Sequence, residues 1–377
     1  MILLFSTISI IAIILLFLHF LMPFLYFLLA KSKWLRLSWN LKIDQKYQPH
    51  VTILIPTYNE AKNISKKLDN IYALEYPKKK LEVVVIDSAS TDGTPNIVYD
   101  WAKRHPDLRV ILLQENSRRG MVPALNYALS RILQDPWREI IIFTDADAFV
   151  ERDALKNIVK YLADKRVGAV TASILPIIQE NSSERVYRNY FNIIRIAESK
   201  FHSTPIHSGQ FMAYNVRILK KLKRLPEYTG NNDSTPASII AFMGYRAIQV
   251  EDVIVREPMR KGQHKRKIRR AQHIILHFLK TKSYAKRLGL YQRSKFNIIW
   301  TIEWWLHIVN PWLFLFGLLL LIADAIIWRS FQSLTIIIIG ALLILFSKKA
   351  STWILCQLYL ILGFLKCIKT TNIAWEK

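Results

Sequence analysis

Three clusters of polar and acidic side chains each follow a short run of β-branched and apolar residues. The clusters are Pro56-Thr57-Tyr58-Asn59-Glu60, Asp87-Ser88-Ala89-Ser90-Thr91-Asp92-Gly93-Thr94 and Asp145-Ala146-Asp147. Two carboxylates two residues apart are suited to hold one hard cation, Mg²⁺ or Mn²⁺, which in turn bridges the phosphates of a nucleotide. A single Asp-x-Asp is weak evidence, because such a pair is common in solvated turns. Three clusters that converge on one crevice are stronger evidence.

Strands and helices alternate around these clusters, as the periodicity of the apolar residues indicates. The expected strands are Val51–Pro56, Leu81–Ile86, Arg109–Leu113, Ile140–Phe143 and Val167–Ala172. Helices are expected from about Glu60, where Ile64, Leu68 and Ile71 recur at helical spacing, from Thr94-Pro95, and over 122–133 and 153–163. This order predicts an α/β fold with a doubly wound, mostly parallel sheet. Ligands of such sheets bind beyond the carboxyl ends of the strands, where the polar clusters lie.

The same clusters resemble those of inverting glycosyltransferases of family 2, which have the GT-A nucleotide-sugar-binding fold. The resemblance covers about 200 residues and rests on four motifs in order: Ile55-Pro-Thr-Tyr-Asn-Glu60, Val85-Ile-Asp-Ser-Ala-Ser-Thr-Asp-Gly-Thr94, Ala124-Leu-Asn126 and Thr144-Asp-Ala-Asp147. It implies a nucleotide-diphospho-sugar donor and a divalent cation. The apolar ends of the chain resemble the membrane-anchored branch of this family, which includes polysaccharide synthases and lipid-linked sugar transferases.

The resemblance also implies roles for individual residues. Substrate-binding positions carried over from the motifs are Pro56, Thr57, Asn59 and Glu60 in the nucleotide pocket, Asp87 at the base, Asp92 near it, and Asn126. Asp147 would be the principal metal ligand, and Asp145 would approach the ribose or the metal. The alternative for Asp92-Gly93-Thr94 is a turn with a helix cap.

One motif departs from the family pattern. The lysine that often follows the glycine before Ala-Leu-Asn is replaced here by Met121. Arg118 or Arg119 would supply the missing charge, or the two form a solvated surface pair.

A displacement at a sugar carbon needs a carboxylate that takes the proton of the acceptor hydroxyl. Asp233 is the candidate, because it lies eleven residues before Gly244-Tyr245, the spacing seen in the family, although Asn232 precedes it in place of an acid. Glu251 and Asp252 lie in a strand-like stretch and are expected to be structural. If the acceptor is an already ionised lipid phosphate, Asp233 would only orient it.

The turn Ser208-Gly209-Gln210-Phe211 resembles the acceptor-side loop that precedes the base, which makes Gly209 and Gln210 substrate-binding candidates. The alternative is an ordinary turn at the entry to a strand.

The two ends of the chain are apolar enough to enter a membrane. Residues 1–30 contain no Asp, Glu, Lys or Arg and are expected to form one transmembrane helix, since about 20 residues span a bilayer core. Lys31, Lys33 and Arg36 place its end in the cytosol. About three further spans are expected in 296–368, from Phe296–Trp328, Ser333–Phe346 and Ser351–Phe364, with a kink or junction at Pro311 and a tail over 369–377. The last two segments are short and would alternatively form a tilted or re-entrant hairpin.

Between the catalytic part, 31–255, and these spans lies a basic stretch, 256–295, with fourteen Lys or Arg side chains and one acid, Glu257. It predicts a pair of interfacial helices beside anionic lipid. Related membrane synthases carry Gln-x-x-Arg-Trp here. Gln263-x-x-Arg266 fits except that Lys267 replaces the tryptophan, and Arg269-Arg270 is the second, favoured alignment. These guanidinium groups suit a diphosphate leaving group.

The whole composition fits a prokaryotic plasma-membrane enzyme with a cytosolic catalytic part. The net charge is +25 while 51% of the residues are hydrophobic, and the basic stretch is bounded by lipid-spanning sequence, which argues against nucleic-acid binding. Cys356 and Cys367 are too far apart on one helix for a disulfide. The expected activity is transfer of a sugar to a membrane-associated lipid or glycan acceptor. The alternatives are a processive polysaccharide synthase and a non-catalytic membrane nucleotide-binding or scaffold protein. The sequence leaves the oligomeric state open.

Overall fold

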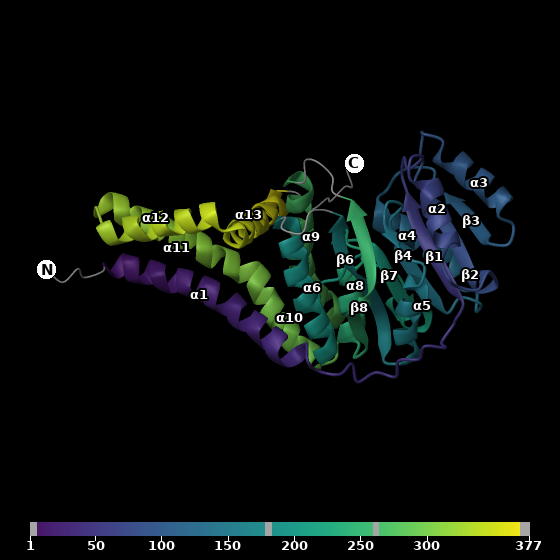
Figure 1. The fold of residues 1–377 in the computed structure, drawn as a ribbon, viewed down its shortest axis with the longest axis horizontal. Helices are drawn as coiled ribbons and strands as arrows, with labels where there is room; N and C mark the ends of the chain where they lie inside the picture. The colour runs from purple at the N-terminus through teal and green to yellow at the C-terminus, as the bar shows by residue number, and fades with distance from the viewer. Residues whose placement is uncertain (1–5, 178–182, 259–263, 370–377) are drawn as a thin grey trace.

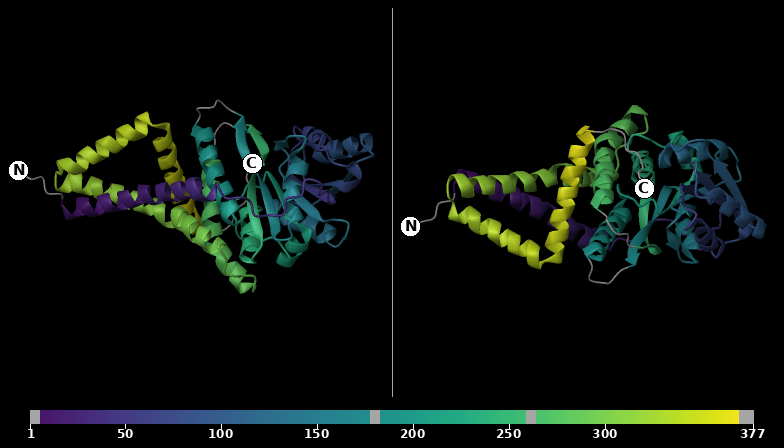
Figure 2. Two further views of the ribbon diagram at one scale, coloured as in Figure 1. Left: turned by 60° about the horizontal axis from the view of Figure 1, so that its bottom comes forward. Right: turned by 90° about the horizontal axis from the view of Figure 1, so that it is seen from above.

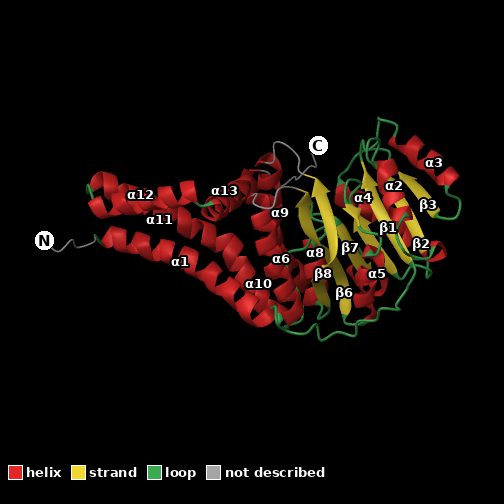
Figure 3. Cartoon of the chain, viewed as in Figure 1, coloured by secondary structure: helices red, strands yellow, loops and turns green. Residues whose placement is uncertain are grey.

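The computed structural model describes residues 6–177, 183–258 and 264–369. Figure 1 shows two parts, an α/β unit and a group of long apolar helices that extends from one side of it. The N-terminal helix enters from the far end of this group, so the chain reaches the α/β unit only after passing along its neighbours. Figure 3 shows the strands as one continuous layer with helices on both faces.

The sheet has eight described strands in the order β3-β2-β1-β4-β7-β6-β8-β5. Their bounds are β1 Val51–Thr57, β2 Leu81–Asp87, β3 Arg109–Gln114, β4 Ile140–Thr144, β5 Phe149–Val150, β6 Val167–Ile177, β7 Phe211–Asn215 and β8 Arg246–Pro258. β3, β2, β1 and β4 are mutually parallel, and β6 is parallel to β8. β7 runs against both of its neighbours, so the sheet is mixed rather than uniformly wound. The α/β fold and all five expected strands are confirmed.

Helices cover both faces of the sheet because the strand side chains that point to either face are mostly apolar. The helices of this unit are α2 Ile64–Tyr72, α3 Thr94–Arg104, α4 Met121–Ile132, α5 Ala154–Val159, α6 Ser183–Phe201, α7 Val216–Leu219, α8 Ser234–Phe242 and α9 His264–Arg287. Ile53 and Ile55 point into a core shared with α2, α3 and α5, whereas Leu54 points into a core shared with α4, α8 and α9. The expected pair of interfacial helices is wrong in its number: within the described residues of 256–295, the long helix is α9 alone.

The apolar helices are α1 Thr7–Leu29, α10 Phe296–Trp304, α11 Asn310–Ile327, α12 Phe331–Phe346 and α13 Lys348–Lys369. Among the described residues, three helical stretches are long and apolar enough to cross a membrane: Thr7–Trp34, Phe296–Ile327 and Lys348–Ile368. α12 is apolar but has only 16 residues. Figure 2 shows α13 turning steeply away from α12, which fits the tilted hairpin better than two upright spans. The expected tail, 369–377, lies outside the described residues except for its first residue.

The junction expected at Pro311 is present. α10 ends in a short π-helical segment, Trp305–Val309, and Pro311 occupies the first turn of α11, where its missing N–H costs nothing. Cys356 and Cys367 are both free thiols, as expected.

The two parts of the chain are joined by buried contacts rather than by a linker alone. The Tyr26 hydroxyl on α1 donates a hydrogen bond to the buried carboxyl group of Glu198 on α6. Trp34 stacks on Phe201 with ring centroids 4.6 Å apart. Ala197 and Ile299 share the same small core, so α6 is one element through which the α/β unit touches the apolar helices, and α9, which packs against α13, is another.

Candidate active site

The loops after β1 and β2 form one interlocked unit. Thr57 lies opposite Asp87 in the register of the two strands, and both side chains are buried. The Asn59 backbone N–H donates to the Ser90 hydroxyl at 2.9 Å, and the Thr91 N–H donates back to the Asn59 amide oxygen at 2.9 Å. Asn59 has a left-handed backbone with φ of 53°, which asparagine tolerates well. Pro56 and Glu60 flank this unit on β1 and in the loop after it.

Asp92 holds the two loops together. One carboxylate oxygen accepts from the Ala61 N–H at 2.9 Å, and the other accepts from the Thr94 hydroxyl at 2.6 Å and the Thr94 N–H at 3.1 Å. The Thr94 hydroxyl in turn accepts from the Glu60 N–H at 2.9 Å. Both oxygens of Asp92 are therefore engaged in shaping the loop at the start of α3.

Asp145 and Asp147 lie in the turn that follows β4. The Ala148 N–H donates to the Asp145 carbonyl oxygen at 3.2 Å and closes this turn. Ala146 and Ala148 are buried while Asp145 and Asp147 are partly exposed, as expected when successive side chains alternate in direction. β4 is adjacent to β1, and β1 to β2, so the turn with both carboxylates lies beside the Thr57 and Asp87 unit.

A lysine that the sequence analysis did not single out lies beneath this turn. Lys67 on α2 is completely buried, and its amine donates to the Thr144 hydroxyl at 2.9 Å and to the Ala148 carbonyl oxygen. Burial lowers the pKa of Lys67 to about 7, while the charge of Asp145 raises it. In the sequence this lysine is one of a Lys66-Lys67 pair on an amphipathic helix, which looks like a solvated face.

The donor set fits a hard divalent cation that is shared with a ligand. Carboxylate oxygens are what Mg²⁺ and Mn²⁺ prefer, and Mg²⁺ is commonly bound by one or two carboxylates together with substrate phosphates. Within the described ranges, no group of three or more His, Cys, Asp or Glu side chains is close enough to hold an ion by itself. Asp145 and Asp147 therefore suit a cation that phosphate oxygens complete.

Asp233 lies directly before α8 and faces the turn that contains Gly209. A Cβ atom added at Gly209 would lie 3.2 Å from a carboxylate oxygen of Asp233 and 3.3 Å from the Asn232 side chain, so only glycine fits there without displacement. Burial raises the pKa of Asp233, and N–H groups of Ser234 and Gly209 and the charge of Arg195 offset part of that rise. A carboxylate with a raised pKa is a stronger base than an exposed one.

Buried polar atoms with no hydrogen-bond partner gather in this turn. Both ring nitrogens of His207 and the side-chain oxygen of Gln210 are buried, and none of the described groups bonds to them. The Gln210 carbonyl oxygen accepts from the Thr144 hydroxyl at 2.7 Å, which links the turn to the end of β4. Arg195 on α6 is also close enough to act electrostatically on His207 and Asp233. Sequence reasoning missed His207 and Arg195, because neither belongs to a motif.

Other candidates lie elsewhere or serve the fold. The Asn126 amide bonds to Leu225 at 2.8 and 3.0 Å and to Glu227 at 2.9 Å, so its side chain holds that segment. Its role in substrate binding stays a prediction. Glu251 pairs with Lys200 and Asp252 with Lys160, in agreement with the expected structural role of both acids.

The two arginines before Ala-Leu-Asn differ in their surroundings. The Arg119 guanidinium pairs with the buried Glu115 carboxylate at 2.7 Å. The Arg118 guanidinium lies 4.0 Å from the centroid of the Tyr58 ring, next to the loop that contains Asn59. Both arginines therefore lie beside the expected nucleotide pocket, Arg118 at Tyr58 and Arg119 through Glu115, which accepts from the Ser88 hydroxyl at 2.8 Å.

Three arginines near the start of α9, Arg266, Arg269 and Arg270, are half-buried, whereas Arg287 at its end is exposed. Arg266 and Arg270 are four residues apart and share a helix face with His277, which packs against α8, whereas Arg269 is turned away from them by about 60–100° at 3.6 residues per turn. Gln263 of the first alignment lies outside the described residues.

Comparisons with known proteins show similarity to glycosyltransferases over most of the chain. Residues 52–223 match the model of the Glycosyl transferase family 2. A solved mannosyltransferase from Pyrobaculum calidifontis, in complex with GDP-Man and Mn²⁺, is 41% identical, with a TM-score of 0.85 over 96% of this chain and 99% of that one.

Curated relatives match over shorter stretches. The chain is 28% identical over 203 residues to a poly-beta-1,6-N-acetyl-D-glucosamine synthase of Staphylococcus epidermidis, which covers 52% of this chain and 47% of that one. It is 38% identical over 122 residues to a beta-monoglucosyldiacylglycerol synthase of a Nostoc species, or 32% of this chain and 25% of that one. The chain thus spans half or less of the length of these relatives.

Proposed function

The chain belongs to glycosyltransferase family 2, and from this premise we propose that it transfers a sugar from a nucleotide-diphospho-sugar to a membrane-associated lipid or glycan acceptor, with inversion. The observation that carries the proposal is the grouping of acidic side chains at the carboxyl-terminal ends of neighbouring strands. Asp87 is the last residue of β2, and Asp145 and Asp147 follow β4; both strands flank β1, as a donor lying across β2, β1 and β4 requires.

The donor would bind along the loops after β1 and β2. Pro56, Thr57, Asn59 and Glu60 would line the nucleotide side and Asp87 would meet the base, with Asp92 keeping the loops in shape. Asp145 and Asp147 would hold Mg²⁺ or Mn²⁺ with the diphosphate. When bound, this cation offsets the negative charge of the departing nucleoside diphosphate.

Asp233 would be the base. With a hydroxyl acceptor, its carboxylate would take the proton as the acceptor oxygen attacks the anomeric carbon from the side opposite the leaving group. Gly209 and Gln210 would contact the acceptor, since their turn faces Asp233. With a lipid phosphate acceptor, already ionised near neutral pH, Asp233 would only orient the attacking oxygen.

The α9 arginines Arg266, Arg269 and Arg270 would bind the diphosphate, because guanidinium groups form paired hydrogen bonds with phosphate oxygens. Negative charge grows on the leaving group during transfer, so such contacts strengthen in the transition state. The basic α9 would also hold the site against the cytosolic face of a prokaryotic plasma membrane.

A processive polysaccharide synthase is the second candidate, because one similar protein is named as a polymer synthase. Lys267 stands where the related synthases carry tryptophan, which removes a stacking platform for a growing chain. Incubation with labelled donor separates the two: single transfer yields one product band, whereas processive synthesis yields a ladder.

The proposal is tested by a donor screen. Purified full-length protein is incubated with a panel of nucleotide sugars, Mg²⁺ or Mn²⁺ and a membrane lipid extract, and both nucleotide release and label in the lipid fraction are measured. We expect one or a few donors to support both signals in a metal-dependent way. Absence of release from every donor would contradict the proposal.

A further inference from the structure

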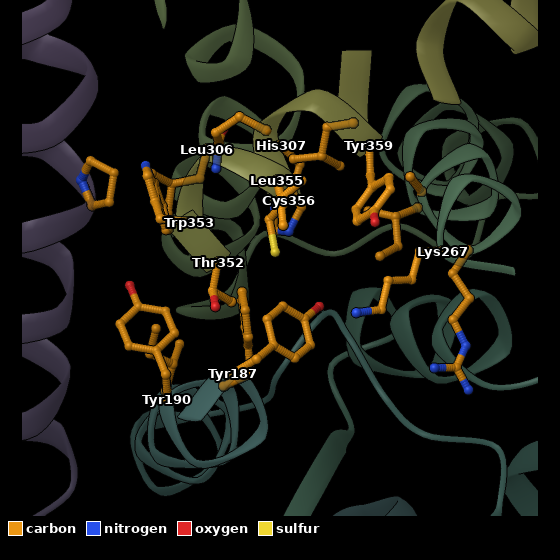
Figure 4. A pocket seen from close by; sticks show the side chains of 18 of the residues that line it. Tyr187, Tyr190, Lys267, Leu306, His307, Thr352, Trp353, Leu355, Cys356 and Tyr359 are labelled. Carbon is orange, nitrogen blue, oxygen red and sulfur yellow. The ribbon is translucent and has the colours of Figure 1, made fainter. Parts of the chain in front are cut away.

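A cavity of about 150 Å³ lies where the α/β unit meets the apolar helices (Figure 4). Its walls come from α6, α9, α13 and the π-helical segment before α11, with Pro23 of α1 at one side. A cavity of this volume is comparable to one that holds a six-membered ring. The space is therefore suited to a head group or a short length of chain rather than to a few water molecules.

The cavity has a charged end and an apolar end. Lys267 and Arg270, one helical turn apart on α9, line the charged end, and the Lys267 amine lies 5.9 Å from the centroid of the Tyr359 ring. Figure 4 shows Lys267 reaching in from one side, with Tyr187 of α6 and Leu355 of α13 on the other walls. Glu303 also lines the cavity, with its carboxyl group 3.1 Å from the His307 ring, so the wall carries two cationic side chains and one carboxyl group.

Two buried polar atoms in the cavity wall call for a ligand. Gln357 is only 3% exposed, and its side-chain oxygen has no hydrogen-bond partner in the described part of the chain. The Thr352 hydroxyl, five residues earlier on α13, is also buried and also has no hydrogen-bond partner among the described residues. A buried polar atom that is left unpaired destabilises the fold. The Gln357 oxygen only accepts hydrogen bonds, so its partner must carry a hydroxyl or an N–H group.

The apolar end is open towards the expected bilayer. Leu355 lines the cavity and is nevertheless 45% exposed, so the cavity has a mouth beside this residue. Leu355 lies on α13, a helix long and apolar enough to enter a membrane. A hydrocarbon chain would leave through this mouth without crossing water.

The inner end of the cavity approaches the candidate base. Ile194 of α6 lines the cavity, and its neighbour Arg195 lies with its guanidinium carbon 5.6 Å from the centroid of the Phe191 ring, another wall residue. Arg195 acts electrostatically both on Glu303 in the cavity and on Asp233 in the candidate active site. One cationic side chain thus lies between the two sites.

We propose that this cavity binds the acceptor and that the acceptor is a lipid phosphate. Its phosphate would pair with Lys267 and Arg270, a head-group hydroxyl would donate to Gln357, and the hydrocarbon chain would leave past Leu355. Arg270 would then contact the acceptor, which leaves Arg266 and Arg269 for the diphosphate. That this ligand is the acceptor depends on the proposed transfer reaction. That the cavity binds a lipid phosphate does not depend on it.

Binding is measured first, with no donor present. The full-length protein in neutral detergent is titrated with radiolabelled dodecyl phosphate and, in parallel, with dodecanol. We expect dodecyl phosphate to bind more tightly, and the double variant Lys267→Gln/Arg270→Gln to weaken it by about tenfold or more, since both charged hydrogen-bond donors to the phosphate are lost. Leu355→Trp, which narrows the mouth, should weaken both ligands.

The matched control removes two charges from the same helix outside the cavity. Lys280→Gln/Lys286→Gln should leave dodecyl phosphate binding within about twofold of the unchanged protein, since exposed charges contribute little. Equal losses of dodecyl phosphate affinity in the two double variants would overturn the proposed site, because the phosphate would then be attracted by the charge of the whole helix and not by Lys267 and Arg270. Equal affinity for the phosphate and the alcohol in the unchanged protein would overturn the ligand class.

Transfer is measured second, with the donor found in the screen and a lipid phosphate of increasing concentration. The Lys267→Gln/Arg270→Gln variant should raise the KM for the lipid by a larger factor than the KM for the donor. Weakened binding with an unchanged lipid KM would contradict the acceptor assignment. If the protein releases no nucleotide from any donor but still binds dodecyl phosphate through Lys267 and Arg270, the proposed reaction fails while the lipid-phosphate site stands.

Discussion

The buried amine of Lys67 donates a hydrogen bond to the Thr144 hydroxyl at 2.9 Å, immediately before Asp145. The same hydroxyl donates to the Gln210 carbonyl oxygen at 2.7 Å. Thr144 therefore links a helix under the sheet to the two parts of the candidate active site, the turn with Asp145 and Asp147 and the turn that faces Asp233. The geometry of both turns depends on one buried lysine.

Replacing Lys67 by methionine should lower both stability and activity. The change removes the donor to Thr144 and Ala148 from a site that excludes water, which costs about 1–3 kcal/mol. Thermal unfolding and nucleotide release measure the two effects. Lys66→Met, one residue earlier and exposed, is the control and should change neither. Equal behaviour of the two variants would contradict the role given to Lys67.

Replacing Gly209 by alanine should reduce kcat more than it changes the KM of the donor. The added methyl group would lie 3.2 Å from the Asp233 carboxylate, so either the turn or the carboxylate has to move by a few tenths of an ångström. A displacement of this kind at a base lowers the rate by about tenfold or more. Gly340→Ala, where a Cβ atom meets nothing within 4 Å, is the control for a glycine-to-alanine change.

The dependence of transfer on pH should report Asp233. Burial raises the pKa of this carboxyl group above the usual 3.8, so the fraction of active, deprotonated enzyme falls as the pH drops through that raised value. With a hydroxyl acceptor, the acid limb of kcat lies above the range of an exposed aspartate, and Asp233→Asn loses nearly all transfer. Transfer by Asp233→Asn at close to the original rate would contradict the assignment of Asp233 as the base, and it is the result expected if the acceptor is the already ionised lipid phosphate.

The segment that joins α1 to the sheet depends on Asp164. This carboxylate accepts from the Lys42 N–H at 2.9 Å and pairs with the Arg166 guanidinium at 2.7 Å. The hydrogen bonds from Arg166 outweigh the effect of burial and hold the pKa of Asp164 well below its usual range. A carboxyl group whose pKa is lower in the folded state stabilises the fold above its unfolded pKa, and this contribution disappears as the pH falls through the folded value.

Asp164→Asn should therefore lower the Tm at neutral pH and have progressively less effect at acid pH. Because Arg166 is largely exposed, the expected loss is about 1 kcal/mol. Thermal unfolding of both proteins is measured from pH 7 to well below pH 3.8, the ordinary value for an aspartate, because the effect starts to decrease only there. A Tm difference that stays constant down to the lowest pH would show that charge pairing is not its cause.

The first half of the α/β unit was predictable because the local pattern of apolar and polar residues is enough to identify its strands. Val51–Thr57, Leu81–Asp87 and Ile140–Thr144 are apolar on both sides, and each ends at a polar cluster. The later elements were harder: the short β7, Phe211–Asn215, runs against its neighbours, and α6 carries many charged residues although it packs between sheet and membrane helices.

Lys67 and Arg195 could not be recognised as site residues from sequence. In the sequence, a lysine or arginine on an amphipathic helix gives the same pattern whether solvent or another element covers it. Whether Lys67 and Arg195 are buried is decided only by the packing of α2 and α6. The Asp145 and Asp147 pair was recognisable because hard-cation chemistry demands that pattern, whereas a buried supporting cation has no pattern of its own. The cavity between α6, α9 and α13 likewise joins segments about 80 or more residues apart.

If the chain transfers sugar from a nucleotide-diphospho-sugar, Asp147 should be required for release of the nucleotide. Release of nucleoside diphosphate is measured with the best donor for the unchanged protein, for Asp147→Ala and for Glu151→Ala, a nearby exposed carboxylate that pairs with Arg256. We expect metal-dependent release that falls by about a hundredfold or more in Asp147→Ala, since loss of a charge-stabilising group in a transition state costs about 3 kcal/mol or more, and that is unchanged in Glu151→Ala. Nucleotide release at the same rate in all three proteins would show that Asp147 has no role in the transfer.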